Sequence, residues 1–297
     1  MDRTQEIMQK VRRIEIQARR LTTSTLSGQY RASFRGQGLE FDDFREYQPG
    51  DEPRFIDWKV TARTGTPYVR KYHEEREQVL LLAVDASASM RYAGGNSEDS
   101  KLEYAARVAA VLAYSAARNG DNVGLLLYGR NPHFYLPPAK GMKQCLRIIR
   151  EIIATEGGEG EMSMEEVAAE ILRTQRKRTM CFLISDFMMA PDKQAIGKLN
   201  FRHELIPLRV SDPMELELPA AAGRVCVQDP ETGEFYNINM ADSAVRNTYS
   251  KAMLSHRREW ELIFTQLGIN MCDLRTDADF IATLRGLFTK RSSHFAR

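Results

Sequence analysis

Short apolar runs alternate with amphipathic segments along most of the chain, from about residue 79 onward. The run VLLLAV at 79–84 is apolar without a break and ends in Asp85, which is typical of a strand covered on both faces in a parallel sheet. Similar runs predict further strands, and the segments between them have a helical period. The expected strands are 79–84, 122–128, 133–136, 179–184, 204–209 and 270–274, and the expected helices are 101–119, 140–154, 163–174, 242–267 and 277–289.

This alternation predicts an α/β fold with a doubly wound, mostly parallel, Rossmann-like sheet over residues 78–290. The turn residues 129–132 (GRNP) predict a hairpin that places one antiparallel strand at the sheet edge. A second β-hairpin is expected within residues 212–241, where strand-like runs flank the turn DPETGE. This excursion lies outside the expected core and is a candidate partner surface.

The first 77 residues follow a different pattern. Residues 1–25 predict an amphipathic basic helix, and residues 26–77, with turns at Pro49-Gly50 and Gly65-Thr66-Pro67, predict a small β-rich segment. We expect Trp58 to anchor this segment by packing. An ion-pair network is expected to tie the segment to the sheet, with direct ligand binding as the alternative. Its members are Arg35, Arg45, Asp51, Arg54, Asp57 and Arg63.

Overall charge gives little indication of a polyanionic partner. The 297 residues contain 42 basic and 40 acidic side chains, a net charge of +2. Such a balance produces no global field toward nucleic acid or an anionic membrane. Residues 1–35 hold eight Lys or Arg against three Asp or Glu, which gives +5 locally. We interpret this as the solvated face of a helix, with a partner-docking or membrane-surface arm as the alternative.

Four widely spaced cysteines, without a CxxC motif, favour a reducing compartment. The N-terminus has no apolar core of a signal peptide, and no run approaches the ~20 apolar residues of a membrane span. We therefore expect a soluble cytoplasmic protein.

Oxygen-bearing side chains follow two of the expected strands. Asp85, Ser87 and Ser89 come directly after the first strand, and Asp186 follows the strand at 179–184. Because ligands bind beyond the carboxyl ends of strands in such sheets, these side chains are expected at one edge. Carboxylates and hydroxyls suit Mg²⁺ first, or Mn²⁺ or Ca²⁺. The alternative is that Ser87 or Ser89 only caps a following helix.

These residues also resemble a known site. DASASM at 85–90 is similar to the metal-ion-dependent adhesion site of von Willebrand factor A-type domains, and SDF at 185–187 resembles its third segment. The upstream segment resembles the bacterial "domain of unknown function 58" proteins, in which it precedes an A-type domain. The matching residues include Phe34-Arg35-Gly36, Arg45-Glu46-Tyr47-x-Pro49-Gly50-Asp51, Arg54-x-Ile56-Asp57-Trp58 and, later, Asp212-Pro213-x-Glu215.

The resemblance implies a set of metal ligands. Asp85, Ser87 and Ser89 correspond to the first segment and Asp186 to the third. The family's second segment usually has a Thr, whereas here Ser163 is the candidate, with Thr155 as the alternative. Two carboxylates leave the shell of a cation incomplete, so water or a carboxylate from another protein would complete it.

The resemblance implies a metal-dependent protein-interaction module that works with a MoxR-type AAA+ ATPase in chaperone-like assembly or activation of other proteins. One alternative is a Mg²⁺-dependent hydrolase or phosphatase that uses Asp85 as nucleophile, although position 87 is Ser where such enzymes resemble DxDx[TV]. Another is nucleic-acid binding through the basic N-terminal helix, which lacks interleaved aromatic residues. We expect a binding module and not an enzyme.

Overall fold

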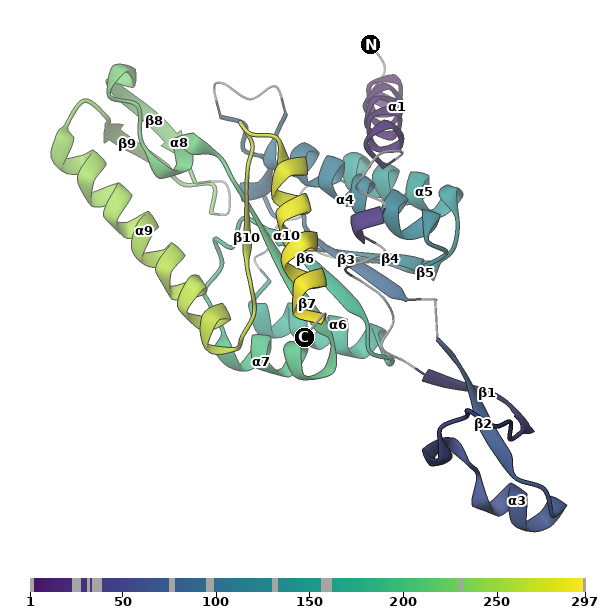
Figure 1. The fold of residues 1–297 in the computed structure, drawn as a ribbon. Helices are drawn as coiled ribbons and strands as arrows, with labels where there is room; N and C mark the ends of the chain where they lie inside the picture. Colours follow the sequence, from purple (N-terminus) through teal and green to yellow (C-terminus); the bar gives the residue numbers. More distant parts are fainter. Residues whose placement is uncertain are drawn as a thin grey trace.

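A six-stranded sheet forms the centre of the molecule (Figure 1). The computed structural model describes residues 3–22, 28–30, 33, 39–74, 78–94, 99–129, 133–155, 162–229 and 232–295. The strands of the sheet are β3 (Val79–Asp85), β4 (Asn122–Tyr128), β5 (Phe134–Ala139), β6 (Met180–Ser185), β7 (Glu204–Ser211) and β10 (Cys272–Arg275). Each strand that the apolar runs predict is present, with bounds that differ by a few residues.

The strand order is β10-β7-β6-β3-β4-β5, and all pairs are parallel except β4 with β5. The first strand, β3, therefore lies inside the sheet, with β4 on one side and β6 on the other. At this reversal of winding direction the loops after β3 and β6 diverge and leave a crevice at the carboxyl edge. The predicted doubly wound sheet with an antiparallel edge strand is confirmed.

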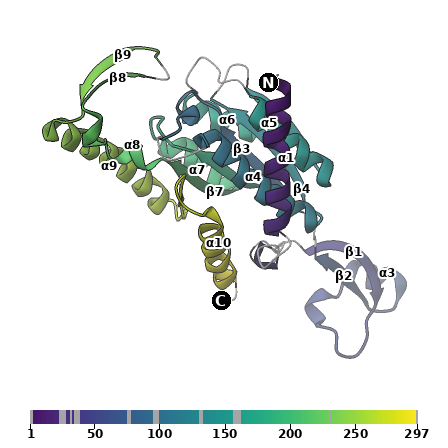
Figure 2. The same cartoon turned by 90° about the horizontal axis from the view of Figure 1, so that it is seen from above.

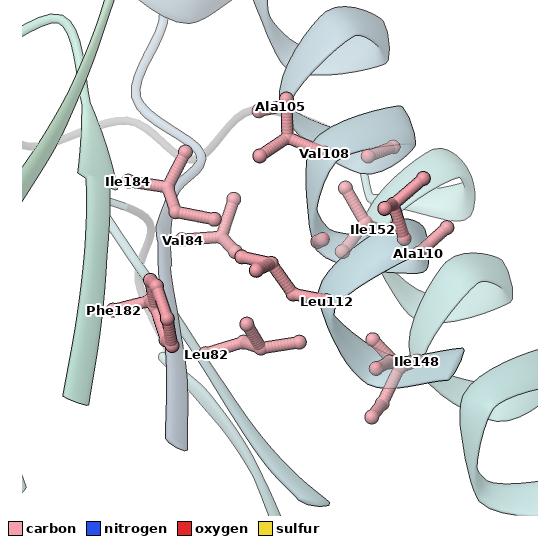
Figure 3. Packing of buried hydrophobic residues seen from close by; sticks show 14 of the residues in the cluster. Leu82, Val84, Ala105, Val108, Ala110, Leu112, Ile148, Ile152, Phe182 and Ile184 are labelled. Atoms are coloured by element: carbon pink, nitrogen blue, oxygen red, sulfur yellow. The ribbon is translucent and has the colours of Figure 1, made fainter. Parts of the chain in front are cut away.

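Helices cover both faces of the sheet because β3 is apolar on both sides. Leu82 and Val84 point toward one cluster, where they meet α4 (Lys101–Arg118) and α5 (Met142–Ala154) (Figure 3). α1 (Arg3–Thr22) and α10 (Phe280–Phe295) complete that layer. Leu81 and Ala83 point into the opposite cluster. That layer contains α6 (Met164–Thr174), α7 (Lys193–Arg202) and the end of α9 (Ser243–Gln266).

The predicted N-terminal helix is confirmed as α1, which lies along α4 and α5 (Figure 2). Its buried side chains include Val11 and Ile14. Two of its basic side chains pair with acidic groups nearby: Lys10 Nζ lies 2.6 Å from a Glu103 carboxylate oxygen and Arg13 Nη2 lies 2.8 Å from Asp99 Oδ1. Part of the local basic charge is thus neutralised within the fold.

A small unit projects from the body of the molecule (Figures 1 and 2). It consists of β1 (Leu39–Glu46) paired antiparallel with β2 (Tyr68–Glu74), with η1 (Pro53–Phe55) and α3 (Trp58–Thr64) between them. The predicted boundary at 25–26 falls within residues 23–27, and the one at 77–78 falls at the end of residues 75–77. Both of these ranges lie outside the described residues.

The expectation for Trp58 is wrong, and two arginines of the expected network form ion pairs inside the unit. Arg45 pairs with Asp51 at 2.6 Å, and Arg54 pairs with Glu52, so these ion pairs close turns within the unit and do not tie it to the sheet. Trp58 is 69% exposed, because it occupies the first position of a short helix that has no layer packed over it. Arg35 lies outside the described residues.

The expected hairpin within 212–241 is confirmed. It starts at α8 (Pro213–Leu216), continues through η3 (Ala220–Ala222), and pairs β8 (Arg224–Gln228) antiparallel with β9 (Phe235–Asn239). The hairpin lies near the start of α9, away from the sheet (Figure 1). Among the described ranges, none of the helices combines the length and apolar character needed to cross a membrane.

We expect Leu112→Ala to lower the free energy of unfolding by about 2–5 kcal/mol, because Leu112 is fully buried between α4 and the sheet and its truncation leaves a cavity. Leu254→Ala on α9 is the matched control, since Leu254 is 46% exposed. Urea unfolding followed by circular dichroism measures both. Equal losses in the two variants would show that this layer is not the core.

Candidate functional site

Four of the residues predicted from the sequence meet at the crevice between β3 and β6. Asp85 ends β3, Ser87 and Ser89 lie in the turn that follows, and Asp186 follows β6. All four line one cavity of about 80 Å³. The other lining residues are Gly129, Met162, Met188 and Met189. This volume exceeds the ~10–15 Å³ that one water needs, so the cavity has room for an ion or a few water molecules.

Hydrogen bonds fix Asp85 at the base of the cavity, where it is 1% exposed. Its Oδ1 accepts from the backbone N–H of Ser87 at 2.9 Å, and its Oδ2 accepts from the Ser185 hydroxyl at 2.6 Å. The turn then enters η2 (Ser89–Arg91), whose Met90 is fully buried. A buried anchor and two hydrogen bonds therefore set the direction of the loop.

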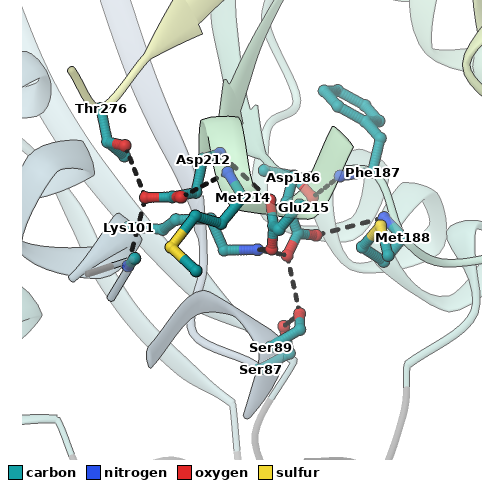
Figure 4. Close-up of polar contacts among 12 residues, drawn as sticks. Ser87, Ser89, Lys101, Asp186, Phe187, Met188, Asp212, Met214, Glu215 and Thr276 are labelled. Atoms are coloured by element: carbon teal, nitrogen blue, oxygen red, sulfur yellow. Dashed lines mark hydrogen bonds and ion pairs between the residues drawn. The ribbon is translucent and has the colours of Figure 1, made fainter. Parts of the chain in front are cut away.

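The two hydroxyls form a chain that ends on Asp186 (Figure 4). Ser87 Oγ lies 3.1 Å from Ser89 Oγ, and the Ser89 hydroxyl donates to Asp186 Oδ2 at 2.8 Å. The alternative of helix caps is wrong: the residue that precedes η2 is Ala88, without a side-chain cap, and Ser100 caps α4. Both hydroxyls instead belong to the carboxylate cluster.

Asp186 has a cationic partner that the sequence analysis missed. Lys101 Nζ lies 2.6 Å from Asp186 Oδ2 and also pairs with Glu215 of α8 (Figure 4). Lys101 is 0% exposed. Its sequence signal is weak, because a Lys at the start of a helix usually lies in solvent. Asp186 Oδ1 accepts from the Met188 N–H at 3.1 Å, so Asp186 is also held on both oxygens.

The candidates for the second segment are not among the cavity-lining residues. Ser163 is the N-cap of α6 in a capping box, where its hydroxyl lies 2.8 Å from Glu166 Oε2. Thr155 ends α5, and its carbonyl accepts from Arg91 at 3.3 Å. Met162, next to Ser163, does line the cavity, and residues 156–161 lie outside the described ranges. A metal-binding role for Ser163 or Thr155 stays a prediction.

Burial shifts the pKa values of the charged groups in and beside the cluster. The pKa of Asp85 is raised to about 6, chiefly by burial and next by the charge of Asp186, while hydrogen bonds from Ser185 and Ser87 oppose the shift. Burial alone would lower the pKa of Lys101, but Asp186 and Glu215 raise it above its usual value. Burial likewise raises the pKa of Glu215, against the effect of Lys101.

The donor set fits a hard divalent cation only in part. Two carboxylates and two hydroxyls are oxygen donors of the kind that Mg²⁺ accepts. Among the described residues, no group of three or more His, Cys, Asp or Glu side chains is placed to hold a metal. This cluster has two carboxylates, so a cation here would keep coordination positions for other oxygens.

Comparison with known proteins places the chain in a family. The family described as "Protein of unknown function DUF58" matches residues 43–259. The chain belongs to the DUF58 family. An uncharacterized protein of Mycobacterium bovis is 31% identical over 280 residues, which cover 92% of this chain and 86% of that protein. An uncharacterized Mycobacterium tuberculosis protein matches equally. The Bacillus subtilis protein YeaD is 26% identical over 108 residues, 36% of this chain and 24% of YeaD.

Solved structures are similar at low identity. The BatB protein of Bacteroides thetaiotaomicron is 16% identical, with a TM-score of 0.44 over 74% of this chain and 98% of that one. A von Willebrand factor type A protein of Catenulispora acidiphila is 12% identical, with a TM-score of 0.37 over 86% of this chain and 50% of that one. The order and direction of the strands, rather than these scores, establish the fold. The predicted DUF58 membership and the doubly wound, mostly parallel, Rossmann-like fold class are confirmed.

The raised pKa of Asp85 predicts that stability in chelator falls as pH rises. The ordinary value is 3.8 and the folded value about 6, so between these values the folded state holds a proton that the unfolded chain has released. This stabilisation is present below about pH 4 and is lost as pH rises through about 6. Urea unfolding across this range measures it. Asp85→Asn should lack this component, and identical pH profiles for wild type and variant would contradict the assignment.

Proposed function

We propose that this DUF58 protein is a divalent-cation-dependent protein-interaction module, with Mg²⁺ as the cation. Asp85, Ser87, Ser89 and Asp186 would hold the ion, and an Asp or Glu of the partner would occupy an open coordination position. The observation that carries the proposal is the convergence of these four side chains on one cavity at the switch point of the sheet.

Charge supports a cation at this place. Asp85 is 1% exposed and Asp186 is 7% exposed, and like charges so close to each other are unfavourable away from water. The hydrogen-bond donors to Asp85 are neutral, a hydroxyl and a peptide N–H. A divalent cation would offset the negative charge that these donors leave.

The family resemblance supports a MoxR-type AAA+ ATPase as the partner, in assembly or activation of a client protein in the cytoplasm. A partner could contact the cavity and the β8–β9 hairpin, whose Phe235 and Tyr236 are exposed. The geometry gives less support to a phosphatase. Both oxygens of Asp85 already accept hydrogen bonds, and Ser87, at the position of an acid/base group, contacts Ser89.

Asp85→Asn tests the proposal. Mg²⁺ at one hundred times its dissociation constant should stabilise the wild type by about 2.7 kcal/mol and leave the variant unaffected. Pull-down of a MoxR-type ATPase should require both Mg²⁺ and Asp85. Asp121→Asn is the control, because Asp121 is also buried but bonds Tyr30 and Gln78 outside the cavity. A Mg²⁺ shift that persists in Asp85→Asn would refute the proposed cation site.

Gly129 provides a second test, without removing a ligand. Its φ is +71°, and an added Cβ would lie 2.6 Å from Asp85 Oδ1 and 2.8 Å from the Ser87 nitrogen. Gly129→Ala should therefore displace Asp85 and weaken Mn²⁺ binding by about tenfold or more. Gly120→Ala is the matched control, since its φ is +85° with nothing within 4 Å. Titration calorimetry with Mn²⁺ compares them, and equal affinities would place the cation elsewhere.

A further inference from the structure

A buried ammonium lies between the proposed cation site and the excursion that starts at α8. Lys101 is 0% exposed and contacts two carboxylates, Asp186 beside the cavity and Glu215 on α8 (Figure 4). A cation is not favoured at the N-terminal end of a helix, where Lys101 is the first residue of α4. The position of Lys101 is therefore explained by its two carboxylate partners and not by the charge distribution of the helix.

Lys101 and an entering cation would compete for the same atom. Asp186 Oδ2 accepts from Lys101 Nζ at 2.6 Å and from the Ser89 hydroxyl at 2.8 Å, and Oδ1 accepts from the Met188 N–H. A divalent ion that binds Asp186 thus comes close to a fixed positive charge in a water-poor environment. Repulsion there is screened little by solvent or salt.

We propose that Lys101 sets the relative affinities of this site for the metal ion and for the partner's carboxylate. Its charge lowers the affinity of the empty site for a divalent cation. The same charge then raises the affinity of the loaded site for the partner's carboxylate. This inference rests on the proposed function of the site.

The signs follow from the charges. Asp85 and Asp186 carry −1 each and Lys101 carries +1, so with a divalent cation the cluster sums to +1. Without Lys101 the same loaded cluster sums to 0. The metal-loaded cluster with Lys101 therefore attracts a carboxylate ligand, and the loaded cluster without Lys101 does not. Before metal binds, the site without Lys101 attracts a cation more strongly than the site with it.

Glu215 determines how strongly the positive charge of Lys101 acts on a cation in the cavity, because it pairs with Lys101. It lies in a capping box with Asp212 at the start of α8. Asp212 is fixed in turn, since its Oδ2 accepts from the Thr276 hydroxyl at 2.8 Å and from the Gly94 N–H at 3.2 Å. Glu215 therefore holds a defined place from which it offsets part of the Lys101 charge.

Two substitutions in this network should act in opposite directions. Lys101→Met keeps the length of the stem and removes the charge, so Mn²⁺ should bind at least about tenfold tighter than to the wild type. Glu215→Gln removes one of the two carboxylates that compensate the Lys101 charge, so Mn²⁺ should bind more weakly. Lys198→Met, on the exposed face of α7, is the control and should change nothing.

The experiment titrates Mn²⁺ into each protein near neutral pH, followed by electron paramagnetic resonance of the free ion. Acetate is then added to the Mn²⁺-loaded proteins, and the line broadening of its methyl proton signal measures carboxylate binding. We expect acetate to bind Lys101→Met more weakly and Glu215→Gln more tightly than the wild type. A merely structural role would shift the two variants in the same direction.

The outcomes separate this inference from the proposed function. If neither the wild type nor Lys101→Met binds Mn²⁺, the proposed function fails. If the wild type binds Mn²⁺ and Lys101→Met binds it no tighter, only the role of Lys101 fails. If Lys101→Met does not fold even with Mn²⁺, Glu215→Gln decides: weaker Mn²⁺ and tighter acetate binding support the role, and unchanged or reversed affinities overturn it.

Discussion

Burial of the Asp85 carboxylate at the end of the central strand is the constraint on which the site depends. A carboxylate moved away from water is costly unless hydrogen bonds or opposite charge compensate it. The Ser87 N–H satisfies one oxygen, so the loop after β3 must turn back at once. The Ser185 hydroxyl satisfies the other, so β6 must end beside β3. The hydrogen bonds of one side chain thus bring two strand ends together.

The two carboxylates are compensated by different means. Asp85 has neutral donors and an elevated pKa, whereas Asp186 is paired with the buried ammonium of Lys101. Because the resident positive charge lies beside Asp186, Asp85 is the group that gains most from an added cation. The charge of Asp186 is therefore compensated within the fold, whereas the negative charge of Asp85 has no cationic partner among its contacts in the described part of the chain and would be available to a metal ion.

Much of the fold was predictable because its strands are buried on both faces. A run such as VLLLAV has few other interpretations, and parallel strands bring Asp85 and Asp186 to one edge by geometry. α7 was missed because its few buried side chains give a weak apolar period. Lys101 was missed because a partner that is distant in sequence, Glu215, makes its burial favourable. Trp58 was misjudged because local sequence does not show whether a layer covers a helix.

The rim of the cavity adds a constraint on any partner. Met162, Met188 and Met189 line it together with the acidic cluster, and Met188 is 42% exposed. Methionine side chains are flexible and adapt to irregular surfaces, so this rim fits apolar contacts of different shapes. The polar base is rigid by comparison, because each carboxylate is held on both oxygens. If the site binds partners as proposed, its fixed polar base and adaptable apolar rim would favour partners that share one acidic residue and differ around it.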